Sequence, residues 1–159
     1  METTQLQQLI QQGLAAMKTG SEMAEKATND ISNAAQHPRL KEALEKGNQT
    51  SKKWAERIER AWREAGGNEH RDNPVIEGVA KVNQNILETV SDADTRDLGI
   101  IAGGQLALHY WIAAFGTMSN YAGEAKLDQA EEDMKACVKE AKKADEEHSE
   151  IAEEILSKK

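Results

Sequence analysis

The chain has 159 residues, a length that suits one domain with a single hydrophobic core. Its formal net charge of −8 at pH 7 argues against the basic surfaces by which proteins neutralise the phosphates of nucleic acids or anionic membranes. Only 4% of the residues are aromatic. Because Cys137 is the single cysteine, an intramolecular disulfide and a cysteine-based zinc site are excluded.

The amino terminus, METTQLQQLI, has no basic region followed by a long apolar run. No segment approaches the roughly 20 apolar residues that a membrane span needs. We therefore expect a cytoplasmic protein with neither nucleic acid nor membrane as a partner.

Helical periodicity dominates the first half of the chain. Apolar and small residues recur every three or four positions over residues 6–31, which predicts a long first helix. Pro38 disfavours helical geometry at His37 and suits the first turn of a helix, so the chain turns there and a second helix begins. A second stripe over residues 40–65 ends at Gly66. These two helices are predicted to form an antiparallel hairpin.

The second half repeats this pattern after a turn-rich segment. Asn73, followed by a proline, predicts the start of a short helix over residues 74–89. Residues 91–94, with the sequence SDAD, supply N-cap chemistry for a long apolar helix that runs to Gly123. A last helix is predicted to start near Glu124 and to end at the carboxy-terminal SKK.

Three segments carry a resemblance to a known family. Residues 105–117, QLALHYWIAAFGT, resemble the third helix of the YciF/YciE-type branch of ferritin-like proteins, which reads roughly Q-x-x-E-H-Y-E-I-A-x-Y-G-T. Residues 40–58, LKEALEKGNQTSKKWAERI, are similar to the family pattern L-x-x-A-F-x-x-H-L-x-E-T-x-x-Q-I-x-R-I, and residues 75–87, VIEGVAKVNQNIL, to M-E-G-L-I-E-E-A-N-E-V-I. The order and spacing of these segments agree with the family over most of the chain.

The resemblance implies an all-α fold over residues 1–159, a single ferritin-like four-helix bundle with a short additional helix crossing between its two helical hairpins. It also implies a bacterial, stress-linked, cytoplasmic protein that forms a dimer. In such bundles two metal ions are held by carboxylate and histidine side chains that project inward from facing helices.

Carried over position by position, the family's metal ligands fall on residues that cannot replace them. These positions are Ser21, Gly47, Thr50, Leu108, Trp111 and Ala141. We therefore expect no bound metal, no cofactor, no catalytic residue and no di-metal oxidase-type chemistry. Trp111 is predicted to occupy the volume of the lost ions and ligands, with Gly47 on the facing helix making room for its indole.

Two classes of function follow from a bundle without its metal site. We favour a non-enzymatic protein that acts by association, as a homodimer or with another protein. The alternative is a small-molecule binder or an enzyme that reuses the former di-metal chamber as an apolar pocket. The candidate pocket residues are Gln105, His109, Tyr110, Trp54 and Glu140.

Each of these side chains also has an ordinary structural interpretation. A lone histidine such as His109 is more often hydrogen-bonded structure than catalyst, and tryptophans at helical spacing are more often core. Residual metal binding is a third alternative, and its candidate ligands are Glu140, Asp145, His148 and Glu22. A closed interior around Trp111 would favour association, whereas a cavity open to solvent there would favour the pocket.

Overall fold

The computed structural model describes residues 3–158, and within this range the chain consists of helices, turns and loops without a strand. The all-α prediction is confirmed. The helices are α1 (Thr3–Ala34), α2 (Pro38–Glu64), α3 (Pro74–Thr89), α4 (Ala93–Glu124) and α5 (Asp128–Ser157).

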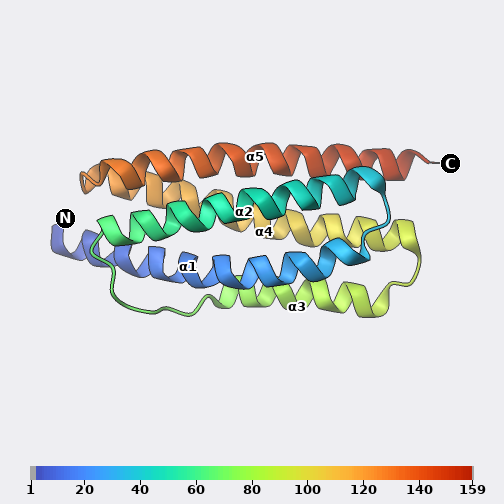
Figure 1. Cartoon of the computed structure of the whole chain (residues 1–159), viewed down its shortest axis with the longest axis horizontal. Coiled ribbons are helices and arrows are strands. Elements are labelled where there is room, and N and C mark those ends of the chain that lie inside the picture. The colour runs from blue at the N-terminus through green and yellow to red at the C-terminus, as the bar shows by residue number, and fades with distance from the viewer. Residues whose placement is uncertain (1–2, 159) are drawn as a thin grey trace.

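The four long helices lie side by side as two antiparallel hairpins, α1–α2 and α4–α5 (Figure 1). Contacts of α2 with α5 and of α1 with α4 close a four-sided bundle. The short helix α3 connects the hairpins in sequence and lies against α1 and α4. The predicted ferritin-like bundle with one additional short helix is therefore the fold of this chain.

The hydrophobic core is divided into two clusters along the bundle axis. The first, which we call the aromatic cluster, contains Trp54, Trp111 and Phe115 with aliphatic neighbours from α1, α2, α4 and α5. The second, the aliphatic cluster, includes Leu40 and Ile151 and lies toward the α1–α2 turn. Helical periodicity places both clusters on the inward faces of the same four helices.

Two predicted N-caps are confirmed. The Asn73 side-chain oxygen accepts a hydrogen bond from the Ile76 backbone N–H at 3.0 Å, and Asp92 accepts one from Thr95 at 2.8 Å. Asn73 also donates to the Ala16 carbonyl at 2.9 Å and to the Tyr110 hydroxyl at 2.7 Å. The start of α3 is thereby fixed to both α1 and α4.

The start of α2 depends on a side chain from another helix. His37, the N-cap residue, makes no side-chain cap hydrogen bond. The fully buried carboxylate of Asp97 on α4 instead accepts hydrogen bonds from the backbone N–H groups of His37 at 2.6 Å and Gln36 at 3.0 Å. These bonds satisfy backbone donors at the α1–α2 turn that would otherwise be buried without a partner.

The last helix begins at Asp128, so the predicted start near Glu124 is wrong. The chain reverses through a turn in which Lys126 has φ of 60°, a left-handed conformation that ends the helical geometry of α4. The first turn of α5 is capped by Glu64 at the end of α2, whose carboxylate accepts the Ala130 N–H at 2.6 Å. A cap supplied by a distant residue leaves no local signal in the sequence.

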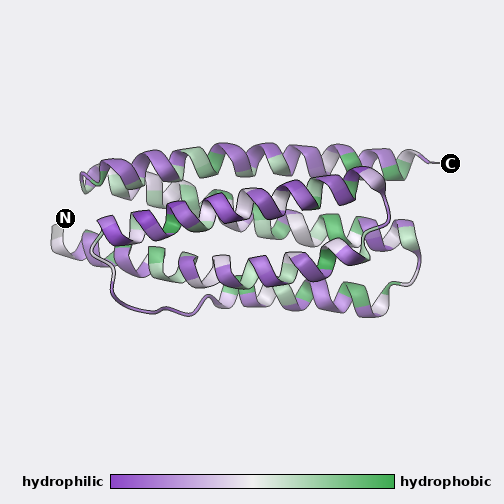
Figure 2. Cartoon of the chain, viewed as in Figure 1, coloured by the Kyte–Doolittle hydropathy of each residue, from purple (hydrophilic) through white to green (hydrophobic). Residues whose placement is uncertain are grey.

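The expectation that no segment approaches the composition of a membrane span is wrong for α4. Its best 18-residue window has a mean hydropathy of 1.4, which by length and composition is enough to cross a membrane, and 33% of that window is buried. The core helix of a bundle meets the same test, and α4 packs against α1, α3 and α5. Figure 2 shows that α2 and α5 are mostly hydrophilic on the side shown. The hydropathy of α4 is therefore weak grounds for a membrane span.

Candidate functional site

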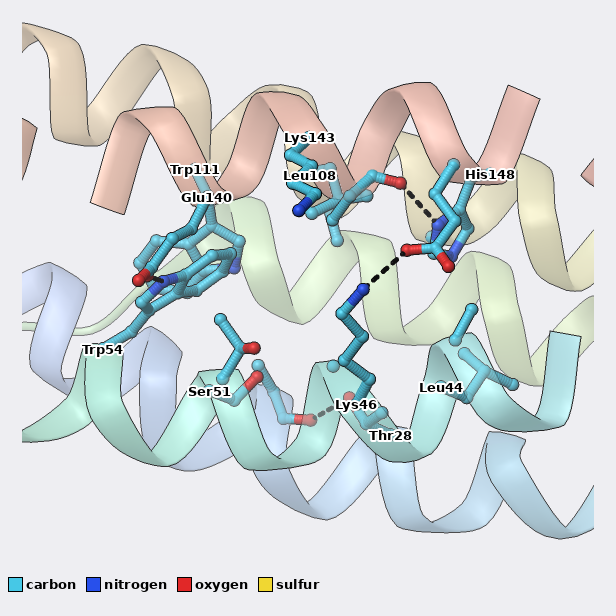
Figure 3. Close-up of a pocket in the computed structure, with 18 residues that line it drawn as sticks. Thr28, Leu44, Lys46, Ser51, Trp54, Leu108, Trp111, Glu140, Lys143 and His148 are labelled. Atoms are coloured by element: carbon cyan, nitrogen blue, oxygen red, sulfur yellow. Dashed lines mark hydrogen bonds and ion pairs between the residues drawn. The ribbon is translucent and has the colours of Figure 1, made fainter. Parts of the chain in front are cut away.

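A cavity of about 270 Å³ lies in the middle of the bundle and is partly open to solvent. It lies between the two clusters, because its lining includes Trp54 and Trp111 from the aromatic cluster and Ala43 and Leu44 from the aliphatic cluster. The lining comes from residues 24–28 of α1, 43–54 of α2, 104–111 of α4 and 140–148 of α5. Figure 3 shows this space between the helices.

The cavity exists because small residues face one another at this level of the bundle. Gly47 of α2, Gly104 and Ala107 of α4 and Ala144 of α5 all line it. A Cβ atom added to Gly47 would meet no atom within 4 Å. Larger side chains on either side of this level, along the bundle axis, hold the four helix backbones apart. The backbones therefore cannot close onto the short side chains, and the space remains.

Four of the six positions assigned to former metal ligands lie together in this cavity. Gly47, Thr50, Leu108 and Trp111 all line it. Ser21 is buried on α1 and Ala141 is fully buried within the aromatic cluster, and neither lines the cavity. The assignment of these six as former ligand positions stays a prediction, while the convergence of four of them is a fact of the fold.

The prediction that Trp111 fills this chamber against Gly47 is wrong. The Trp111 indole is buried, but it stacks on Phe115 with ring centroids 5.1 Å apart and lies 6.2 Å from the Trp54 ring. It forms one wall of the cavity and leaves the space beside Gly47 open. Aromatic rings gain contact area and favourable geometry from one another, which explains why the indole packs with the neighbouring aromatic layer.

Two of the five candidate pocket residues line the cavity. Trp54 and Glu140 do so, with the Trp54 indole N–H donating to the Glu140 carboxylate at 2.8 Å. Gln105, His109 and Tyr110 do not line it, and their placement in the pocket is wrong.

These three side chains are engaged elsewhere. Gln105 donates to the Ser149 hydroxyl at 2.9 Å, and an exposed His109 lies 3.1 Å from the Asp145 carboxylate. Tyr110 packs edge-on against Trp111, its hydroxyl accepts from Asn73, and burial raises its pKa.

Helical spacing accounts for this division. The cavity-facing residues of α4 are Gly104, Ala107, Leu108 and Trp111, which follow the i, i+3, i+4, i+7 spacing of one helix face. A residue adjacent to one of these is rotated by about 100° around the axis, so His109 points away from the face that Leu108 shares.

Glu140 stands at the boundary between the aromatic cluster and the cavity. It accepts the Trp54 indole N–H and an Arg57 guanidinium N–H at 2.7 Å. Burial is the largest single influence and raises its pKa, but the hydrogen bonds from Arg57 and Trp54 together outweigh burial, so the pKa of Glu140 lies below its usual range. The carboxylate is therefore ionised and occupied at neutral pH.

The side chains that line the cavity do not supply the ligands that a pair of metal ions needs. Glu140 and Glu147 are the carboxylates that line it, and each is already engaged, with Arg57 and Lys46 respectively. They are seven residues apart on one helix, about 10 Å along its axis, too far to share an ion. Within residues 3–158 no group of three or more His, Cys, Asp or Glu side chains is arranged to hold a metal.

Asp145 and His148, two of the candidate ligands for residual metal binding, also do not converge. Asp145 turns toward His109 of α4, while the His148 Nδ1 lies 2.8 Å from the Ala144 carbonyl and the ring lines the cavity. Cys137 is buried without lining the cavity, and burial raises the pKa of its thiol to about 12. Its structural interpretation as a small core residue therefore suffices.

Sequence reasoning missed the ion pairs that join α2 to α5, two of which have a carboxylate in the cavity lining. The seam between α2 and α5 is joined by ion pairs in which every cation belongs to α2 and every carboxylate to α5. Four of them, with nitrogen–oxygen distances of 2.7, 3.4, 2.7 and 2.8 Å, are Arg39–Glu154, Lys46–Glu147, Arg57–Glu140 and Arg60–Asp133. The repeated three- and four-residue spacing of charges on α2 and α5 was the available signal.

Lys143 interrupts this pattern at the level of the cavity. It places a cation on α5, where the seam otherwise has carboxylates, and its amine points into the cavity in Figure 3. Among the described residues, no carboxylate lies within the 4.0 Å ion-pair distance of this amine. From α2 the cavity wall presents the uncharged residues Gly47, Thr50 and Ser51, together with Lys46, whose amine is paired with Glu147.

Comparisons with known proteins agree with the fold. The model of the family described as "Domain of unknown function (DUF892)" matches residues 3–159. The crystal structure of the Escherichia coli stress protein YciF has a TM-score of 0.92 and 20% identity, covering 97% of this chain and 98% of that one. YcfI from Rhodopseudomonas palustris, described as a proposed structural protein, has a TM-score of 0.86 and 23% identity, with 91% and 92% covered. No curated protein matches the chain.

Proposed function

The chain belongs to the DUF892 family, and from this premise we propose that it is a non-enzymatic binding protein that holds a small apolar ligand where its ferritin-like relatives would hold metal. The observation that carries the proposal is the cavity of about 270 Å³, partly open to solvent, on the inward faces of four helices. An open cavity at Trp111 is the outcome that favours the pocket over a closed, purely associative bundle.

The cavity has the properties of a small ligand site. Its wall is mainly apolar, with Leu44, Leu108 and the rings of Trp54 and Trp111. Since a cavity of about 150 Å³ accepts benzene, this one would hold roughly ten or eleven non-hydrogen atoms. Ligand sites combine such a wall with a few polar groups at the rim.

The absence of catalysis and of metal is part of the proposal. No nucleophile with an adjacent base lines the cavity among the described residues, and its two carboxylates are held by Arg57 and Lys46. Protein purified from iron- or manganese-supplemented culture should contain less than about 0.1 metal ion per chain, because no chelating set of ligands is present. Stoichiometric metal would contradict the proposal.

Ligand binding is tested with octan-1-ol, a neutral molecule of suitable size. Calorimetry should detect its binding to the native protein, and Gly47→Leu should abolish it because the added side chain enters the cavity. Gly78→Leu is the matched control, since Gly78 also has open space around its Cβ position but lies on α3 outside the cavity. Binding that survives Gly47→Leu would place the ligand elsewhere.

Association with a second copy is the other candidate, and the exposed apolar face of α4 favours it. Ala102, Leu106 and Ala113 are exposed along one side of this helix, with Leu106 53% exposed and His109 between Leu106 and Ala113. For a chain of net charge −8, a stripe that presents no carboxylate of its own is where a second copy meets the least repulsion. The bacterial, cytoplasmic, stress-linked setting that the family resemblance implies is kept with this proposal.

Light scattering of the native protein tests association. We expect the mass of a dimer for the native chain and of a monomer for Leu106→Lys, because a charge would be buried in the interface. Leu156→Lys is the control, since Leu156 is 68% exposed but lies on α5. A monomeric native protein, or equal effects of both substitutions, would contradict this interface.

A further inference from the structure

We propose that the ligand of the central cavity is a small monocarboxylate with a compact apolar body, held with its carboxylate at Lys143. This inference rests on the proposed ligand-binding function and adds the chemical class of the ligand. The observation behind it is that Lys143 has no carboxylate partner among the described residues while lining an apolar cavity.

The ion-pair seam indicates which charge is missing. Along the seam a cation on α2 faces a carboxylate on α5, as in Arg57–Glu140 and Lys46–Glu147, whose carboxylates stand on the cavity wall on either side of Lys143. Between these two pairs α5 presents the cation Lys143, and the residues of α2 that line the cavity there are Gly47, Thr50 and Ser51. An anionic group supplied by a ligand would complete the seam at this one level.

The flanking carboxylates do not compete for this lysine in the structure. Glu140 receives hydrogen bonds from Arg57 at 2.7 Å and Trp54 at 2.8 Å, and Glu147 lies 3.4 Å from the Lys46 amine. Lys143 is therefore the available cation at the cavity. The hydroxyls of Thr50 and Ser51 also line the cavity and could donate to the same carboxylate.

The remaining space requires an apolar body. Leu44 at one end and the Trp54 and Trp111 rings at the other would cover it, and Glu140 is too well satisfied to recognise a second polar group. An eight-carbon carboxylate has ten non-hydrogen atoms, which agrees with the roughly ten or eleven that the cavity volume accommodates.

The test compares octanoate, octan-1-ol and octylammonium, which share a chain length and differ in head-group charge. Calorimetry on the native protein should give tightest binding for octanoate and weakest for octylammonium, with about two- to fivefold between successive ligands, as expected for a partly exposed ion pair. The indole N–H resonances of Trp54 and Trp111 should shift on binding, while that of Trp62, which does not line the cavity, should not.

Charge reversal then identifies the recognising group. Lys143→Glu should invert the order, so that octylammonium binds more tightly than octanoate, while octan-1-ol keeps its affinity. Lys142→Glu makes the same charge reversal at the adjacent residue, which is exposed like Lys143 but does not line the cavity, and should leave the order unchanged.

The outcomes separate this inference from the proposed function. Equal affinities for the three ligands, or an order that Lys143→Glu does not change, would overturn the carboxylate assignment. If octan-1-ol still binds and Gly47→Leu still blocks it, the apolar site stands without that assignment. Failure of all three ligands to bind would overturn both.

Discussion

Two neighbouring layers of one bundle differ in whether their side chains fill the space between the helices. In the aromatic cluster, Trp54, Trp111 and Phe115 pack with centroid distances of 5.1 to 6.2 Å. About two helical turns away, Gly47 and Gly104 face the cavity of about 270 Å³. The same four backbones pass through both layers, so side-chain volume alone decides which layer is a core and which can be a site.

The comparison also explains how the open layer survives. A large void would ordinarily destabilise the fold, because its lining loses van der Waals contacts. Here the closed aromatic cluster and the aliphatic cluster hold the helices apart on both sides, and ion pairs such as Arg57–Glu140 join α2 to α5 beside the cavity. The two packed clusters stabilise the bundle, so the open layer between them can contribute little to folding stability and still persist.

The largest expected effect separates the two layers on a single helix. Trp111→Glu should destabilise the protein by about 3–5 kcal/mol, because it removes a buried indole and leaves a charge within the aromatic cluster. Leu108→Glu, one turn earlier and half-buried at the open cavity, should cost about 1–2 kcal/mol, since the new carboxylate can reach water. Urea denaturation monitored by circular dichroism measures both.

Equal costs for these two variants would contradict the distinction between the layers. A cost below about 1 kcal/mol for Trp111→Glu would show that the indole is not held by its aromatic neighbours. Because Leu108 contacts the aromatic cluster with part of its surface, a small cost for its variant is expected and supports the comparison.

A second prediction compares two glycines inside helices. Alanine is the better helix former, so without steric effects both substitutions should stabilise by about 1 kcal/mol. Gly47→Ala should realise this gain, because its Cβ enters open space. Gly103→Ala should instead destabilise by about 1–3 kcal/mol, because its Cβ would overlap the side-chain oxygen of Asn83 on α3. Thermal unfolding of the two variants gives opposite shifts, and shifts of the same sign would contradict the placement of one glycine.

Most of the fold could be predicted because its determinants are local. Apolar spacing defines each long helix, and Asn73 and Asp92 cap α3 and α4 with their own side chains. The start of α5 was misplaced because its cap, Glu64, lies more than sixty residues earlier in the chain. Asp97, which holds the α1–α2 turn, escaped notice for the same reason.

The position of the candidate site along the bundle could be predicted, but the side chains that fill or line it could not. The family resemblance brought Gly47, Thr50, Leu108 and Trp111 to one level, where the cavity is found. Whether Trp111 would fill that level depends on the direction of its side chain, which residue type and spacing do not determine. Lys143 was missed because a lysine between two glutamates on one helix ordinarily indicates local pairing, whereas here both glutamates pair with α2.

The smallest expected effect concerns Glu140, at the boundary of the two layers. Its pKa lies below the usual value of 4.5, so the ionised form stabilises the folded chain at neutral pH. This contribution is present above about pH 4.5 and is lost as the pH falls through the lowered pKa. Glu140→Gln should therefore be less stable than the native protein at pH 7, by less than about 1 kcal/mol because the pair is partly exposed, and the difference should shrink toward pH 3. Denaturation midpoints across this range measure it, with Glu132→Gln, an exposed residue of the same helix, as the control for losing one surface charge. If the stability difference between the native protein and Glu140→Gln grew on acidification, the folded chain would hold Glu140 in its neutral form. The boundary of the cavity would then carry no carboxylate anion at this position.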